Sequence, residues 1–258
     1  MAHDFDGKKY EKASTHQREW GVKLISELSM KGHEHVLDLG CGDGTNTAMI
    51  AELLPNGQVV GIDASQGMIE AAKPKERDNL KFVLMDIDVI AFVDEFDIIY
   101  SNATLHWIKD HERLLKNLHT ALRKGGLVRF NFAGEGNCSH FFKVIRKAMK
   151  VDEFAAYFEN FSWPWYMPSI DEYSVLVEKS ELKDRKVWGE NADRFFPDTE
   201  AMTGWLDQPS LVPFLSYVSD YHKADFRNFV IKEMIEETRQ NDGRCFETFR
   251  RINFFAKK

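Results

Sequence analysis

The stretch VLDLGCGDG, Val36 to Gly44, decides the fold of this 258-residue chain. It opens as a short apolar strand interrupted only by Asp38, and glycines then stand at positions 40, 42 and 44. Glycines at a strand end permit a tight turn and let backbone N–H groups approach a ligand closely. Residues 45–54 follow with apolar side chains at helical spacing. The stretch therefore predicts a strand, a ligand-binding turn and a helix whose N-terminus faces the same ligand.

Short apolar runs alternate with helical patterns through the first half of the chain. Apolar runs typical of strands cover residues 35–40, 58–63, 80–86, 96–102 and 127–134. Helices are expected at residues 45–54, after the N-cap candidate Ser65, and from His111 to Lys124, where Gly125 and Gly126 stop the last one. Nearly continuous apolar strands separated by helices indicate a parallel, doubly wound sheet covered on both faces.

The order is weaker after Gly134. Residues 139–149 and 170–181 have helical patterns, and an aromatic loop with two prolines, FSWPWYMPS, lies between them. Two further runs, RKVWGENADRFF (185–196) and FETFRRINFFAKK (246–258), are expected to pair as the last, antiparallel strands. Residues 198–241 are too long for a plain loop and predict a helical insertion over one edge of the sheet. Its Trp205 and Phe214 are candidates for the roof of a substrate pocket or for core positions.

We expect one domain spanning residues 1–258. It comprises an N-terminal helical cap over residues 1–32, a ligand-binding core over residues 33–134, and a C-terminal half over residues 135–258. The formal net charge of −7 argues against a nucleic-acid partner, which would need clustered Lys and Arg for the phosphates. Three scattered cysteines indicate a reducing compartment, and no apolar run approaches membrane-spanning length. A cytoplasmic monomer or homodimer is expected.

Acidic residues end the second and third predicted strands. Asp63 comes about 20 residues after the glycine turn, where a carboxylate can accept hydrogen bonds from both ribose hydroxyls of an adenosine. Asp86 is placed to accept a hydrogen bond from an exocyclic amino group, with Ile87 and Met68 on either side of a flat base. A capping or loop role is a common alternative for Asp63, and Asp86 taken alone fits a solvated loop carboxylate better than a ligand-binding residue. Their common position at the carboxyl edge of the sheet favours ligand binding.

The glycine spacing separates two classes of nucleotide-binding fold. A dinucleotide-binding turn usually reads G-x-G-x-x-G, whereas this turn reads G-x-G-x-G and continues with Thr45. Together with Asp38 before the turn, this spacing weakens a nicotinamide dehydrogenase interpretation. Metal-assisted chemistry is not expected, because Asp86 and Asp88 alone are too small a ligand set and His33 and His35 are at the start of the first strand, the wrong end for this site.

Four segments together resemble the class I S-adenosylmethionine-dependent methyltransferases. VLDLGCGDG is similar to the glycine motif of that family, GID to its ribose-binding acid, MDI to its adenine motif, and FDIIYSNATLHW to the segment beside the methionine part of the cofactor. The resemblance implies a Rossmann-like, seven-stranded sheet with the last strand antiparallel, and S-adenosyl-L-methionine as cofactor. The implied cofactor-binding residues are Asp38, Gly40, Cys41, Gly42, Asp63, Ala64, Met68, Asp86, Ile87, Asn102 and Ala103.

Within this family the segment YSNATLHWIKDH, residues 100–111, is similar to trans-aconitate methyltransferases. Trp107, together with Tyr10 and Gln17, also resembles the juvenile hormone acid methyltransferases, whose corresponding Gln and Trp hold the substrate carboxylate. The resemblance therefore implies that Gln17 and Trp107 bind a small acid. His106 is a candidate catalytic base for a phenol or amine, although a carboxylate is already ionised at neutral pH and needs none.

Several readings remain open at this stage. The methyl acceptor is expected to be a small molecule, and a free carboxylate oxygen is the favoured site of methylation. N- or C-methylation of another metabolite is an alternative, as is a cofactor-binding protein without turnover. Trp107 is either a residue that fills the core or a site residue. Gln17 is either a solvated helix residue or a residue that binds the substrate, and His106 is either a supporting or a catalytic residue.

Overall fold

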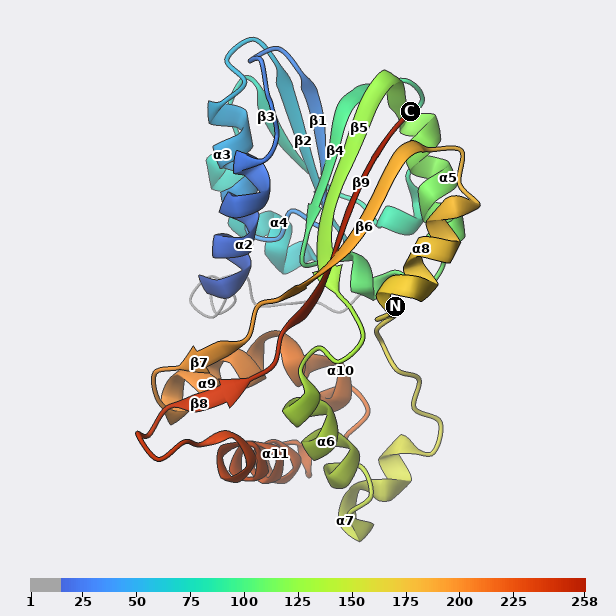
Figure 1. The fold of residues 1–258 in the computed structure, drawn as a ribbon. Coiled ribbons are helices and arrows are strands. Elements are labelled where there is room, and N and C mark those ends of the chain that lie inside the picture. Colours follow the sequence, from blue (N-terminus) through green and yellow to red (C-terminus); the bar gives the residue numbers. More distant parts are fainter. Residues whose placement is uncertain (1–14) are drawn as a thin grey trace. The chain divides into compact units, whose positions relative to one another are not determined.

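The computed structural model describes residues 15–258, and its strands form a seven-stranded sheet and a separate two-stranded sheet (Figure 1). In spatial order the large sheet contains β3 (Leu80–Leu84), β2 (Gln58–Asp63), β1 (His35–Leu39), β4 (Phe96–Asn102), β5 (Leu122–Ala133), β9 (Arg250–Lys257) and β6 (Lys183–Asn191). Strands β3 to β5 pair in parallel, and β9 is antiparallel to β5. The predicted doubly wound sheet with an antiparallel last strand is confirmed.

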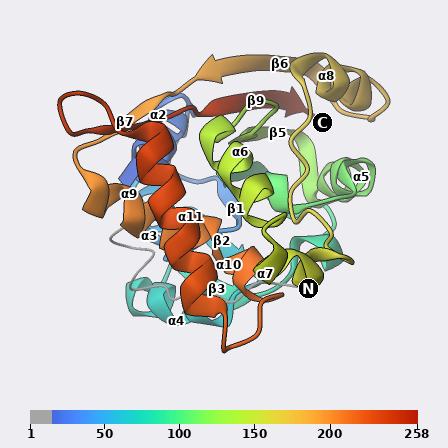
Figure 2. The same ribbon diagram turned by 90° about the horizontal axis from the view of Figure 1, so that it is seen from below.

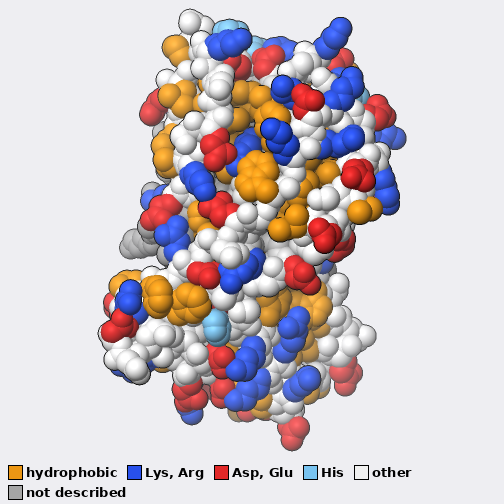
Figure 3. Space-filling view, in the orientation of Figure 1, with side chains coloured by type: hydrophobic (Ala, Val, Ile, Leu, Met, Phe, Trp, Pro, Cys, Tyr) orange, Lys and Arg blue, Asp and Glu red, His pale blue; other side chains and the backbone are white. Residues whose placement is uncertain are grey.

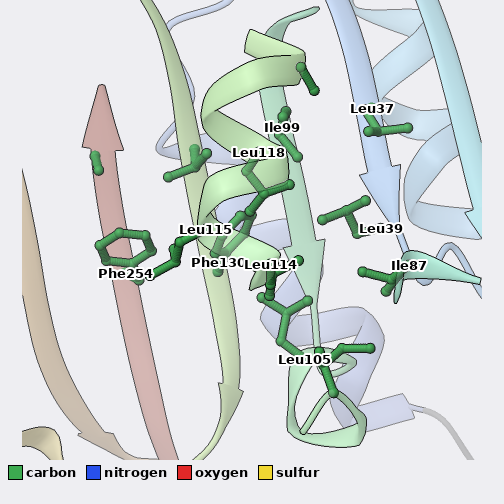
Figure 4. Close-up of a cluster of buried hydrophobic side chains, with 14 of the residues drawn as sticks. Leu37, Leu39, Ile87, Ile99, Leu105, Leu114, Leu115, Leu118, Phe130 and Phe254 are labelled. Atoms are coloured by element: carbon green, nitrogen blue, oxygen red, sulfur yellow. The ribbon is translucent and has the colours of Figure 1, made fainter. Parts of the chain in front are cut away.

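Helices cover both faces of the large sheet (Figure 1). One layer consists of α2 (Thr15–Ser26), α3 (Thr45–Glu52) and α4 (Gln66–Ala72), and the other of α5 (His111–Ala121) and α8 (Ile170–Glu178). Successive strand residues point to opposite faces, so Ile98 and Tyr100 pack under the first layer and Ile99 under the second. Figure 4 shows the second core, where Leu118 of α5 packs over Ile99 and Phe130.

The strand order reverses between β1 and β4. The next strand after β1 in the chain, β2, lies on one side of this pair, and the next strand after β4, β5, lies on the other. In open α/β sheets a crevice forms outside the carboxyl ends of the strands at such a reversal, because the connections leave in opposite directions. The carboxyl ends of β1 and β4 carry Leu39 and Asn102, and the segments predicted to bind the ligand follow them directly. The topology thus places the candidate site at this edge.

Helix α5 is shorter than predicted. We expected it to reach Lys124, but it ends at Ala121, and β5 already begins at Leu122, which is opposite Phe96 of β4. Leu122 is fully buried and has an extended backbone, so strand pairing and burial override the helical pattern. Gly125, with φ +82°, accommodates the register shift between Phe96 and Ile98 instead of stopping a helix.

Contacts between residues divide the chain into two compact units. The first contains the large sheet, and the second combines residues 136–164 and 191–250. Its elements are α6 (Ser139–Ala148), α7 (Asp152–Ala155), β7 (Arg194–Phe196), α9 (Thr199–Trp205), α10 (Val212–Leu215), α11 (Lys223–Thr238) and β8 (Cys245–Glu247). Figure 2 shows α6 beside α11, where ion pairs join Lys143 to Glu237 and Lys147 to Glu233.

The second unit confirms the helical character of residues 198–241 and corrects two details. RKVWGENADRFF contains two strands, because β6 ends at Asn191 and β7 pairs with β8 in the small sheet. Trp205 and Phe214, which we considered as pocket residues, are buried among aromatic rings of this unit, including Phe141. The single-domain organisation and the position of the insertion at the sheet edge stay predictions.

The surface carries mixed charge. On the face drawn in Figure 3, basic and acidic side chains alternate over short distances. Among residues 15–258, no helix combines the length and apolar character needed to cross a membrane. The same residues contain no group of three or more His, Cys, Asp and Glu side chains arranged to hold a metal ion.

Candidate functional site

The glycine turn after β1 has the backbone shape that the sequence predicts. Gly40, Gly42 and Gly44 have φ angles of +74°, +55° and +77°, which residues other than glycine rarely adopt. The N–H groups of Gly40 and Cys41 donate to the carbonyl oxygen of Ile62, at 2.8 and 2.9 Å. The turn is therefore fastened to the end of β2, beside Asp63.

The three glycines face different surroundings. A Cβ atom on Gly40 would lie 2.1 Å from the Thr104 side chain, and one on Gly44 would lie 2.5 Å from the Phe82 ring. Nothing lies within 4 Å of the corresponding position on Gly42. Gly40 and Gly44 thus allow close internal packing, whereas Gly42 presents open backbone to a ligand.

Asp63 lies half-buried at the end of β2, with one oxygen bonded to the glycine turn and the other to the start of α4. Oδ2 accepts a hydrogen bond from the Gly42 N–H at 3.0 Å, and Oδ1 accepts one from the Ser65 N–H at 2.9 Å. A carboxylate has about four acceptor positions, so these bonds leave room for two hydroxyl donors. Burial raises the pKa of Asp63, although backbone hydrogen bonds from Ser65, Gly42 and Ala64 oppose the shift. Ala64, next in the chain, is exposed.

Asp38 and Cys41 are buried under the turn. Asp38 Oδ2 accepts a hydrogen bond from Thr47 Oγ1 at 2.7 Å, which ties β1 to the start of α3. Burial raises the pKa of Asp38 to about 7. Burial, with the nearby charge of Asp63, raises the pKa of the Cys41 thiol well above its usual range. Cys41 is therefore a packed thiol and not a nucleophile at neutral pH.

The end of β3 places the third segment beside the second. Asp86 is exposed, and its Oδ1 accepts a hydrogen bond from the Asp88 N–H at 2.9 Å, capping a short 3₁₀ turn at Ile87–Val89. Ile87 and Met68 are only 5% and 4% exposed, and Ile87 belongs to the core under α5. Their proposed position on either side of an adenine ring stays a prediction.

At the end of β4, Asn102 and Ala103 combine a strained backbone with an unpartnered polar atom. Ala103 has φ +57°, and its N–H donates to the Asn131 carbonyl oxygen at 2.7 Å. Left-handed backbone at a residue other than glycine or asparagine costs about 1–2 kcal/mol and concentrates at functional sites. Asn102 Nδ2 donates to the Gln17 carbonyl oxygen of α2 at 2.7 Å, while its buried Oδ1 has no partner within residues 15–258.

Gln17 lies half-buried on α2 next to this strand end. Its Oε1 is shielded from solvent and, like Asn102 Oδ1, has no hydrogen-bond partner in the described chain. Two buried oxygens without donors are costly, at about 1–3 kcal/mol each, unless a ligand supplies the hydrogen bonds. The ammonium group of S-adenosylmethionine is such a donor, so the Asn102 oxygen at the end of β4 fits the expected cofactor. Tyr10 lies outside the described residues.

His106 and Trp107 lie in a 3₁₀ turn at Leu105–Trp107, directly after β4. Trp107 is half-buried, and its ring is 5.4 Å from Trp165 and 5.7 Å from His106. The core position in this turn belongs instead to Leu105, which Figure 4 shows pointing into the cluster under α5. Trp107 is therefore not part of the main hydrophobic core.

Burial lowers the pKa of His106 well below its usual range, and the positive charge of Arg251 adds to this effect. Its Nδ1 is shielded from solvent and has no hydrogen-bond partner among residues 15–258. The His106 backbone carbonyl accepts from the Tyr166 N–H at 2.7 Å, which fixes Tyr166 beside the turn. His106 is thus a neutral imidazole with one unused ring nitrogen.

A buried polar row under α2 was missed from the sequence. Asn102, Asn131 and Asn253 are opposite one another on β4, β5 and β9, and Arg129 and Arg251 flank them on the same face. Arg129, Asn131, Arg251 and Asn253 are each at most 4% exposed. The available signal was the alternation of polar and apolar residues in VRFNF (128–132) and RINF (251–254), whose apolar members belong to the other core.

Comparisons with known proteins agree with this geometry. A family described as "Methyltransferase domain" matches residues 36–126. A trans-aconitate 2-methyltransferase of Deinococcus radiodurans is 29% identical over 91% of both chains, and one of Acidovorax ebreus is 25% identical over 99% of both.

Among solved structures, the YcgJ protein of Bacillus subtilis has a TM-score of 0.62 at 15% identity, covering 93% of this chain and 98% of its own. Phosphoethanolamine N-methyltransferase 2 of Haemonchus contortus, in complex with S-adenosyl-L-methionine, has a TM-score of 0.61 at 19% identity. That match covers 98% of this chain, which spans only 56% of the nematode enzyme. These likenesses at low identity concern the fold.

Proposed function

Because the chain is a class I S-adenosylmethionine-dependent methyltransferase, we propose that it methylates a free carboxylate oxygen of a small molecule. The observation that carries the proposal is the neutral, half-buried His106 beside Trp107, directly after β4. Burial and the positive charge of Arg251 lower the pKa of His106, and of these two causes the charge also disfavours a cationic acceptor. An anionic acceptor gains from the same positive charge.

The cofactor would be held by the segments at the carboxyl edge. Asp63 would accept hydrogen bonds from the ribose, the backbone at Gly40 and Gly42 would lie along the methionine part, and Asn102 with Ala103 would face the ammonium group. Asp38 and Cys41 would support the turn from below, and Ala64, Met68, Asp86 and Ile87 would surround the adenine. When bound, S-adenosylmethionine supplies a sulfonium methyl group, and its C–S bond breaks as the ester C–O bond forms.

The remaining task of the protein is to hold the acceptor in line and exclude water. Gln17 and Trp107 each have an N–H donor that would bind the reacting carboxylate without adding a charge. Neutral donors leave the carboxylate oxygen more nucleophilic than a bound cation would. The indole rings of Trp107 and Trp165, 5.4 Å apart, would shield this region from water.

No general base is required for this reaction. A carboxylate with a pKa of about 4 is ionised at neutral pH, so the acceptor arrives without a proton to remove. His106 would then orient the acceptor by one hydrogen bond from or to Nδ1. The two trans-aconitate 2-methyltransferases similar to this chain support the proposal, since their names identify an acid as acceptor.

One observation favours a second candidate, N-methylation of a small amine. Neutral His106 has an unused ring nitrogen, which could accept the proton that an amine loses on methylation. Phosphoethanolamine N-methyltransferase 2, which has a similar fold, is named for that chemistry. The charge of Arg251 nevertheless disfavours a protonated amine near His106.

The test is methyl transfer from labelled S-adenosylmethionine to small acids and their matched amides and amines. We expect labelled products from acids alone. Trp107→Phe and Gln17→Ala should each lower kcat/KM for the acid about 10- to 100-fold, the cost of one hydrogen bond to a charged group, with S-adenosylhomocysteine affinity unchanged. Trp188→Phe is the matched control, because Trp188 is a half-exposed tryptophan on β6.

Labelling of amines with no labelled acid would refute carboxylate methylation. Loss of S-adenosylhomocysteine binding in Trp107→Phe would assign Trp107 to the cofactor and not to the acceptor. Equal losses in Trp107→Phe and Trp188→Phe would show that the effect is not specific to the candidate site.

A further inference from the structure

His111 is a buried histidine that takes no part in the proposed reaction. It begins α5, four residues after Trp107 in the chain, and it is 2% exposed. Burying an imidazole is unfavourable unless its ring nitrogens are hydrogen-bonded. The structure provides a partner for each of the two nitrogens, so the residue belongs to a complete polar network inside the core.

The hydrogen bonds of His111 fix where its ring carries the proton. Nε2 lies 3.0 Å from the carbonyl oxygen of Leu105, and Nδ1 lies 3.3 Å from the hydroxyl oxygen of Tyr173. A carbonyl oxygen can only accept, so Nε2 carries a proton and donates to it. Burial lowers the pKa of His111 to about 4, which leaves the ring neutral at pH 7. Nδ1 is then an acceptor, and the Tyr173 hydroxyl donates to it.

The hydrogen bond to Leu105 acts on the turn that carries His106 and Trp107. Leu105 is the first residue of that turn. The next carbonyl oxygen along the chain, that of His106, accepts from the Tyr166 N–H at 2.7 Å, and the Tyr166 ring lies 5.0 Å from the His111 ring. Two successive carbonyl groups of the turn are therefore held by His111 and by a residue packed beside it.

Aromatic packing holds the imidazole itself in place. Tyr173 is fully buried on α8, and its ring meets the His111 ring edge-on, at an angle of 84° with 5.4 Å between the centres. Phe132 of β5 lies 5.5 Å from His111 and 5.0 Å from Tyr173. Because α5, α8 and β5 all belong to the first unit, these rings give the hydrogen bond to the turn a rigid base.

An apolar side chain at position 111 could fill the same space. Leu114, Leu115 and Leu118 of the same helix are core residues of this kind. A leucine at position 111 would bury as well as they do, but it could not donate to the Leu105 carbonyl oxygen. The property that histidine adds at this position is therefore the directed hydrogen bond to the turn, and not the filling of the core.

We infer that His111 is a positioning residue, which holds the Leu105–Trp107 turn through its hydrogen bond to the Leu105 carbonyl oxygen and so orients Trp107 toward the methyl acceptor. Tyr173 supports it by keeping the proton on Nε2. The inference rests on the proposed function for the role of Trp107 at the acceptor. The hold on the turn itself does not depend on which substrate is methylated.

The first test follows Trp107 directly, by ¹⁹F NMR of protein labelled with 5-fluorotryptophan. The signal of Trp107 is the one that is absent in Trp107→Phe. His111→Leu should shift or broaden this signal and leave that of Trp188 on β6 in place. His111→Gln should restore it, because the glutamine amide can donate to the Leu105 carbonyl oxygen as Nε2 does. His119→Leu is the matched control, since His119 is a half-buried histidine near the end of the same helix.

The second test reads the position of the proton. ¹⁵N NMR of the histidine rings at pH 7 should show the Nε2–H form for His111, whose signals are the ones absent in His111→Gln. In Tyr173→Phe the Nδ1 atom loses its donor, so the Nδ1–H form should appear and the Trp107 signal should move toward its position in His111→Leu. Tyr173→Phe removes a single oxygen atom and keeps the ring, so it decides the question if His111→Leu does not fold.

Kinetics connect the turn to the reaction. With trans-aconitate as acceptor, His111→Leu should lower kcat about 10- to 100-fold and change KM less, because a mobile turn still binds the acid but holds it in line less often. His111→Gln should stay within about threefold of wild type, because the donor is kept. Unchanged S-adenosylhomocysteine affinity confirms that each variant is folded.

Each outcome bears on one claim. A Trp107 signal that stays in place in His111→Leu overturns the inference, even if acids are methylated. Joint shifts of the Trp107 and Trp188 signals, or an equal effect of His119→Leu, also overturn it, because the change would then act on the whole fold. An Nδ1–H ring in the wild type overturns the hydrogen bond on which the inference depends.

Two further outcomes separate the hold on the turn from the reaction. A selective shift of the Trp107 signal with unchanged kcat and KM in His111→Leu overturns the orienting role in catalysis. A selective shift in a protein that methylates no acid upholds the hold of His111 on the turn and refutes carboxylate methylation.

Discussion

Replacing Asp38 by asparagine should flatten the pH dependence of stability between pH 5 and 8. Asp38 is 2% exposed and accepts a hydrogen bond from Thr47 Oγ1 at 2.7 Å. Burial raises its pKa from 3.8 to about 7, with a further contribution from the negative charge of Asp63. Asparagine keeps an oxygen for Thr47 but does not titrate, so the change removes the ionisation and little else.

The sign and size follow from proton linkage. The Asp38 carboxyl loses its proton near pH 3.8 in the unfolded chain but near pH 7 in the folded protein. Between these values the folded protein binds more protons, so wild-type stability falls as pH rises. At about 1.4 kcal/mol per pKa unit the full loss is about 4 kcal/mol, of which about 2–3 kcal/mol falls between pH 5 and 8.

Urea unfolding followed by tryptophan fluorescence at pH 5, 6, 7 and 8 measures this loss. From pH 5 to pH 8 the free energy of unfolding of wild type should fall by about 2–3 kcal/mol relative to that of Asp38→Asn. Asp86→Asn is the control, because Asp86 is an exposed aspartate on the same edge of the sheet. A difference that is constant with pH would refute the argument that burial holds the proton on Asp38.

Three further predictions concern the glycine turn and His106. Gly44→Ala should destabilise the protein by at least about 2 kcal/mol in urea unfolding, because its Cβ would meet the Phe82 ring at a positive φ angle; a smaller loss would contradict the packing argument. Gly42→Ala should cost less stability but weaken S-adenosylhomocysteine binding, and unchanged affinity would show that Gly42 does not face the cofactor. The kcat/KM for an acid should be constant from pH 6 to 8, because the pKa of His106 lies well below 6.5; a rise that disappears in His106→Gln would identify His106 as a base.

The first half of the fold was predictable because local signals and burial agree there. Buried strands in a parallel sheet read as apolar runs, and β2 and β4 have the bounds expected from the sequence. Ser65 caps α4, accepting from the Met68 N–H at 3.3 Å. The predicted end of α5 at Lys124 was wrong, because helix propensity at Leu122 competes with strand pairing to Phe96. Only the folded sheet reveals that pairing.

The location of Gly42 and Asp63 at the carboxyl edge of the sheet was predictable, because Gly42 follows β1 and Asp63 ends β2. Their role in binding a cofactor stays a prediction. The structure also argues against Trp107 as a residue of the main core, since Leu105 takes the core position of that turn. Arg251 was not predictable, because its partners Asn131 and Trp20 are 120 and 231 residues away in the chain. A polar residue within an apolar run indicates a buried network only once the neighbouring strands are known.

The most direct test of carboxylate methylation is the stability of the product to mild alkali. The protein is incubated with S-adenosylmethionine labelled in the methyl group and with trans-aconitate, and the isolated product is then treated with dilute hydroxide. Our account predicts a methyl ester that releases its label as methanol. Labelled product that survives the hydroxide, with its methyl group on nitrogen or carbon, would contradict it.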